Sequence, residues 1–148
     1  MFEEQLSQAI ISFIREEGYT PFVQIPHFMG RIDFLGINNS ECIVIESKIN
    51  KWKSALKQAI RYGYGAEKTY VALPSPTASY VASNFKEKFE QYGIGLIDVN
   101  EAYAIVLIDC KNKAPSPIFK QIILNEAQER LSKSQRRIDE FVRRFKNE

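Results

Sequence analysis

Residues 30–62, GRIDFLGINNSECIVIESKINKWKSALKQAIRY, contain the pattern from which the fold of this protein can best be predicted. At the centre of this stretch is a short apolar run that begins at Cys42 and ends in two charged residues, Glu46 and Lys48. Apolar residues at successive positions predict a strand that is covered on both faces. Because side chains alternate along a strand, Cys42, Val44, Glu46 and Lys48 are expected on one face. A carboxylate and an ammonium group therefore leave the core side by side where this strand ends.

A second carboxylate is expected next to the first. Residues 31–37 also have the pattern of a strand, and Asn38-Asn39-Ser40 has the composition of a turn. If residues 38–41 join an antiparallel hairpin, Asp33 lies opposite Glu46, with Cβ atoms about 4.5–5.5 Å apart. Two ionised carboxylates at that distance repel each other unless a cation lies between them, and an oxygen-rich site of this kind suits Mg²⁺. Lys48 beside them can neutralise charge on a phosphate or orient an attacking water.

The arrangement of an Asp, a hairpin and Glu-Ser-Lys resembles the signature of the PD-(D/E)XK nuclease superfamily, with Asp33, Glu46 and Lys48 at its three positions. Ile32 stands where a proline is usual in that family. Gln58 and Tyr62 in the following helix resemble the QxxxY element of RecB-like members. Within the superfamily, the chain thus resembles the RecB-like and Holliday-junction-resolvase-like proteins.

The resemblance implies a restriction-endonuclease-like fold and a metal-dependent nuclease that hydrolyses DNA phosphodiester bonds. Asp33, Glu46 and the carbonyl of Ser47 would bind Mg²⁺ or Mn²⁺, and Lys48 would position or activate the water. Gln58 would help to orient Lys48 and the substrate. The alternatives are a non-catalytic module that binds nucleic acid or a partner on a nuclease-like fold, an assembly protein, and a solvated Glu–Lys pair without chemistry.

A cationic row follows the predicted site. Within a helix expected over residues 52–63, basic residues recur every four positions and share one face. We interpret this row, together with Tyr62, as a substrate-binding surface for the DNA backbone, since like charges in one row otherwise repel. An ordinary solvated basic face is the alternative. The row consists of Lys53, Lys57 and Arg61, and Lys51 precedes it.

The remaining segments predict a mixed α/β sheet flanked by helices. Helices are expected over residues 2–17 and 77–92, and further strands over 19–25, 68–73, 94–99 and 103–109. The helix at 77–92 is expected to bury Tyr80, Val81, Phe85 and Phe89. In the first helix Glu3 is a candidate third acid, although a helix-dipole role is favoured. His27 is interpreted as an incidental loop residue.

The predicted domain organisation is a nuclease-like core over residues 1–114 and a C-terminal helical extension over residues 115–148. The extension is rich in basic residues and has spaced apolar ones, and Ser132-Lys133-Ser134 is a candidate interruption. It is expected to pack on the core, to form a homodimer with a second copy, or to lie along DNA.

The length and composition of the chain argue against several classes of protein. The chain has 148 residues, a single-domain size, and a net charge of +2, which by itself does not indicate nucleic-acid binding. With two cysteines far apart and one histidine, a zinc site is not expected. We found no signal peptide and no apolar run near the roughly 18 residues that a membrane span requires, so a cytoplasmic location without membrane partners is expected.

Overall fold

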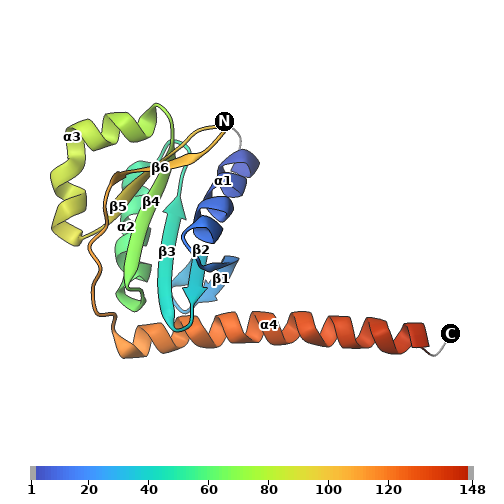
Figure 1. Ribbon diagram of the computed structural model, residues 1–148. Helices are drawn as coiled ribbons and strands as arrows, with labels where there is room; N and C mark the ends of the chain where they lie inside the picture. Colours follow the sequence, from blue (N-terminus) through green and yellow to red (C-terminus); the bar gives the residue numbers. More distant parts are fainter. Residues whose placement is uncertain (1–2, 147–148) are drawn as a thin grey trace.

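The computed structural model describes residues 3–146, which form a six-stranded sheet with helices on both faces and a long C-terminal helix (Figure 1). The strands are β1 (Thr20–His27), β2 (Gly30–Asn38), β3 (Glu41–Ser47), β4 (Lys68–Pro74), β5 (Gly95–Val99) and β6 (Ala104–Ile108). The helices are α1 (Glu3–Glu16), α2 (Trp52–Tyr62), the short 3₁₀ helix η1 (Gly63–Gly65), α3 (Thr77–Tyr92) and α4 (Pro117–Lys146). This confirms the predicted mixed α/β class, with a sheet flanked by helices and a long C-terminal helix.

The strands lie in the sheet in their chain order, β1 to β6. β2 pairs antiparallel with β1 and with β3, β4 pairs parallel with β3 and with β5, and β6 returns antiparallel beside β5. The two parallel pairs follow from the helical crossovers α2 and α3, because a helix between two strands returns the chain in the same direction. The β2–β3 ladder pairs Asn38 with Glu41 and Phe34 with Ile45, which is the register predicted for the hairpin. The turn is shorter than predicted, because Asn38 and Glu41 belong to the strands and only Asn39 and Ser40 lie between them.

Strand β3 is buried on both faces and separates the two halves of the core. Its side chains alternate, so Ile43 and Ile45 pack in the cluster that contains α1, whereas Cys42 and Val44 pack in the cluster that contains α4. A third cluster joins α2 and α3 to β4 and β5. The continuous apolar run of β3 is therefore explained by cover on both sides.

Helix α3 differs in detail from the prediction. Val81 and Phe89 are buried as expected, but Tyr80 is 58% exposed. Phe85 has a non-helical backbone (φ −133°, ψ 19°), so the helix is kinked at this residue. The buried stripe of α3 consists of Ala78, Val81 and Phe89, with Phe85 partly buried against it, and Tyr80 lies beside this stripe rather than in it.

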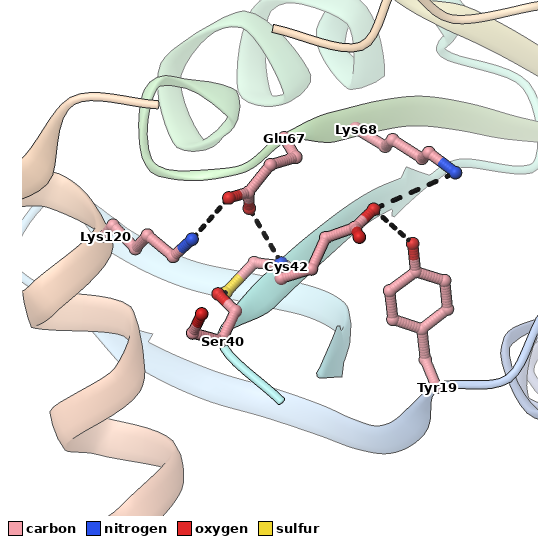
Figure 2. A network of polar contacts seen from close by, with 7 residues as sticks. Tyr19, Ser40, Cys42, Glu67, Lys68 and Lys120 are labelled. Carbon is pink, nitrogen blue, oxygen red and sulfur yellow. Dashed lines mark hydrogen bonds and ion pairs between the residues drawn. The ribbon is translucent and has the colours of Figure 1, made fainter. Parts of the chain in front are cut away.

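Helix α4 is tied to the core through Glu67, the residue that precedes β4 (Figure 2). One carboxylate oxygen of Glu67 pairs with Lys120 of α4, and the other accepts a 2.8 Å hydrogen bond from the backbone N–H of Cys42. The buried side chains of Ile123 and Ala127 complete the contact. Beyond this docked part, α4 runs on past β1 and away from the core (Figure 1).

Two predictions about loops were wrong. His27 is the last residue of β1 and is buried, with its ring 5.1 Å from the Tyr62 ring and stacked on Phe28. The C-terminal helix continues through Ser132-Lys133-Ser134 without a break, because neither Gly nor Pro is present there, and Ser134 Oγ donates within the helix to the Arg130 carbonyl. Residues 1, 2, 147 and 148, at the ends of the predicted helices, lie outside the described residues.

Candidate active site

The β2–β3 ladder ends in a reciprocal pair of side-chain hydrogen bonds. The backbone N–H of Asp33 donates to Glu46 Oε2 at 2.8 Å, and the backbone N–H of Ser47 donates to Asp33 Oδ2 at 3.1 Å. The last backbone-paired residues before this point are Phe34 and Ile45. Continuing their register by one position places Asp33 opposite Glu46, so each carboxylate binds the backbone of the other's strand. The two predicted acids are therefore brought together.

Burial makes this pair electrostatically unusual. Glu46 is fully buried, and desolvation, followed by the nearby Asp33 charge, raises its pKa from 4.5 to about 9. Desolvation also raises the pKa of Asp33, against the opposing effects of the Ser47 N–H and the Lys48 charge. Without a cation, the pair favours at least one protonated carboxyl.

A cavity of about 180 Å³ opens beside the pair. Asp33, Ser47 and Lys48 line it from the β2 and β3 side, together with Phe34 and Ile49. The N-terminal turns of α1 contribute Glu3, Leu6 and Ser7, and β1 contributes Gln24. The lysine and the candidate third acid therefore face the same space as Asp33.

The donor set fits a hard divalent cation in composition. Glu46 Oε1 is buried and has no hydrogen-bond partner among the described residues, so the protein leaves one oxygen of this carboxyl group unsatisfied. Asp33 and the carbonyl of Ser47 supply further oxygen atoms of the kind that Mg²⁺ and Mn²⁺ prefer. Within residues 3–146, however, no three His, Cys, Asp or Glu side chains gather closely enough to hold a metal. Two carboxylates and a backbone carbonyl would therefore be the protein ligands of such a cation.

Tyr62 fixes the start of β2. Its side chain is buried, and its hydroxyl accepts a 2.9 Å hydrogen bond from the Arg31 N–H and donates to the Met29 carbonyl at 3.3 Å. Gly30 lies directly beneath the hydroxyl with φ +138°, where an added Cβ would overlap the Tyr62 oxygen. The second residue of the QxxxY pair therefore holds the backbone a few residues ahead of Asp33.

The predicted basic row lies on the outer side of α2. Lys51, Lys53, Lys57 and Arg61 are exposed, and within residues 3–146 none has an ion-pair partner within 4.0 Å. Lys53 Nζ lies 5.8 Å from the centre of the Trp52 ring. Gln58 is half-buried on the same helix and lies outside the set of residues that line the cavity.

Sequence reasoning missed Gln24. This residue lies in β1 but has φ +53°, in the left-handed region, and it lines the cavity beside Asp33 and Lys48. An isolated glutamine in an otherwise ordinary strand gives no signal of its own, because the conformation is held by contacts with a distant helix.

No family model and no curated protein matches the chain by sequence. Among solved structures, a protein of unknown function from Silicibacter pomeroyi is similar, with a TM-score of 0.67 and 14% identity over 92% of this chain and 90% of that one. An XisH family protein from Nostoc punctiforme has a TM-score of 0.52 and 17% identity over 71% of this chain and 99% of that one. The Ca²⁺ complex of SfsA from Pyrococcus furiosus has a TM-score of 0.44 and 11% identity over 75% of this chain and 65% of that one. At these identities, the first two similarities concern the fold alone. Within the described residues, no helix has the length and apolar character that crossing a membrane requires.

Proposed function

We propose that this protein is a metal-dependent nuclease that hydrolyses DNA phosphodiester bonds at Asp33, Glu46 and Lys48. The observation that carries the proposal is the locked carboxylate pair. Two acids accept hydrogen bonds from each other's strands, one of them keeps a buried oxygen without a partner, and a lysine lines the cavity beside them. A solvated surface pair does not account for a fully buried glutamate with a pKa near 9.

Each residue has a distinct role in this proposal. Asp33, Glu46 and the Ser47 carbonyl would hold Mg²⁺ or Mn²⁺, which when bound would supply charge stabilisation to the phosphate and lower the pKa of water. The ammonium group of Lys48 would orient the attacking water by a hydrogen bond and stabilise the charge that develops on the phosphate oxygens. Gln58 would assist Lys48 from α2.

The exposed row on α2 would bind the DNA backbone. Three cations at four-residue spacing repel one another in the free protein, and phosphates beside them remove that repulsion and release counterions. Without an ion-pair partner within the described chain, Lys53, Lys57 and Arg61 are available for this contact. Affinity for DNA is therefore expected to fall steeply with salt.

The proposal is tested by nicking of supercoiled plasmid and by cleavage of branched DNA. Wild-type protein is assayed with Mg²⁺, with Mn²⁺ and with EDTA, and Asp33→Asn and Lys48→Ala are assayed with Mg²⁺. Lys86→Ala, which changes an exposed lysine on α3 far along the chain from the site, is the matched control. Cleavage by the wild type and the control alone, and only with metal, supports the proposal.

Equal nicking in all samples would show a contaminating nuclease and end the proposal. DNA binding without any cleavage would favour the alternative, a binding module on a nuclease-like fold. Calorimetry with Mn²⁺ separates these cases further, because a module that only binds DNA has no need for the cation.

A further inference from the structure

The backbone of Gln24 departs from its strand next to the acid pair. The β1–β2 ladder pairs Val23 with Phe34 and Ile25 with Ile32, but the intervening pair, Gln24 and Asp33, is missing from it. The φ of Gln24 is +53°, a conformation that residues with a Cβ disfavour. A strained residue of this kind persists only where surrounding contacts hold it, and such residues concentrate at functional sites.

Arg130 of α4 makes the contacts that hold the backbone of Gln24 in this conformation. Its Nη1 donates to the Val23 carbonyl and its Nη2 donates to the Gln24 carbonyl, each at 2.9 Å. Two parallel hydrogen bonds from one planar, charged group fix both the distance and the orientation of these carbonyls. Arg130 lies one turn beyond Ala127, the last buried residue of α4, so the docked part of the helix places it.

With its backbone held in this way, Gln24 places an uncharged side-chain amide at the wall of the cavity beside Asp33 and Glu46. Gln24 lines that cavity together with Asp33, Ser47 and Lys48. It is exposed, and within residues 3–146 its side-chain amide makes no hydrogen bond. An amide N–H donates to a phosphate oxygen without the charge that would compete with a cation held by the carboxylates.

We propose that Gln24 binds a phosphate oxygen of DNA at this site through its side-chain amide, and that Arg130 is the positioning residue that presents it. The inference rests on the proposed function, because it takes the cavity to be where DNA phosphate binds. In this proposal, the long C-terminal helix α4 contributes to the site through Arg130.

The contribution of the Gln24 side chain can be distinguished from that of its backbone conformation by variants that retain the positive φ. Gln24→Gly removes the side-chain amide, and glycine readily adopts a positive φ. Gln24→Asn keeps a side-chain amide, and asparagine also tolerates a positive φ. Arg130→Met keeps the length of the side chain and removes both hydrogen bonds. Arg137→Met is the control, since Arg137 is exposed on the same helix and makes no hydrogen bond or ion pair within the described chain.

Two quantities are measured for each variant. The Kd for a fluorescein-labelled DNA is measured by anisotropy with Ca²⁺ in place of Mg²⁺, and KM and kcat for cleavage are measured with Mg²⁺. Gln24→Gly and Arg130→Met are each expected to raise Kd and KM by about tenfold, as for one lost charge-assisted hydrogen bond, with little change in kcat. Gln24→Asn, Arg130→Lys and the control are expected to lie closer to the wild type.

The double variant Gln24→Gly/Arg130→Met tests the positioning role directly. If Arg130 acts through Gln24, the double variant binds DNA no more weakly than Gln24→Gly alone. Multiplicative losses would overturn the positioning role, and an unchanged Kd in Gln24→Gly would overturn the phosphate contact. A wild type that binds DNA without cleaving it would refute the proposed hydrolysis, while the Kd values would still decide this inference. A wild type that does not bind DNA would refute both.

Discussion

Replacing Glu46 with Gln should change how the stability of the metal-free protein depends on pH. The pKa of Glu46 rises from 4.5 to about 9 on folding, because the side chain is fully buried and lies next to Asp33. A group whose folded pKa is raised contributes its full stability below the unfolded pKa and loses it as the pH rises through the folded pKa. The free energy of unfolding of the wild type should therefore fall between about pH 4.5 and about pH 9.

The magnitude follows from the proton that the folded protein binds in this window. One proton corresponds to about 1.4 kcal/mol per pH unit, so the free energy of unfolding should fall by about 3 kcal/mol between about pH 5.5 and about pH 8. Glu46→Gln keeps an oxygen that can accept from the Asp33 N–H but has no proton to lose. The raised pKa of Asp33 acts in the same direction in both proteins, so the difference between them isolates Glu46.

Urea denaturation in EDTA at several pH values measures this difference, with Glu140→Gln, an exposed change on α4, as the control. The curves for the wild type and Glu46→Gln should diverge with rising pH, and saturating Mn²⁺ should stabilise the wild type more at higher pH, since it binds the ionised carboxylates. A difference between the two proteins that is constant across the pH range would refute the reasoning about Glu46.

Three further predictions concern the residues that hold the site and α4 in place. Tyr62→Phe leaves the Arg31 N–H without its acceptor and should lower the free energy of unfolding by about 1–2 kcal/mol in urea denaturation, whereas the exposed Tyr64→Phe should have no effect. Gly30→Ala places a Cβ on the Tyr62 hydroxyl and should cost about 2 kcal/mol more than Gly18→Ala, which has positive φ but open space; equal costs would contradict the overlap. Lys120→Met breaks the ion pair with Glu67 and should cost about 2 kcal/mol, with faster hydrogen exchange in residues 117–131; unchanged exchange would show that the apolar contacts alone dock α4.

The sequence determined the hairpin and its register. The polar turn residues between two apolar strands fix where the hairpin folds back, and the resulting register sets Asp33 opposite Glu46. The parallel crossovers and the exposed row on α2 followed from local periodicity in the same way. These features depend on residues that are close in the chain, so their geometry can be worked out from spacing.

The surroundings of the Asp33–Glu46 pair depend on contacts between segments that are distant in the chain. The burial of Glu46 depends on packing from several elements, and the left-handed Gln24 depends on Arg130, which is more than a hundred residues away in the chain. The hydroxyl of Tyr62 reaches the backbone at Gly30 only because α2 packs on β3 and β4 and the Tyr62 side chain lies in the cluster that includes Ile32 and Leu35 of β2. Contacts between distant segments leave no periodic trace in either segment, and so no local pattern could predict them.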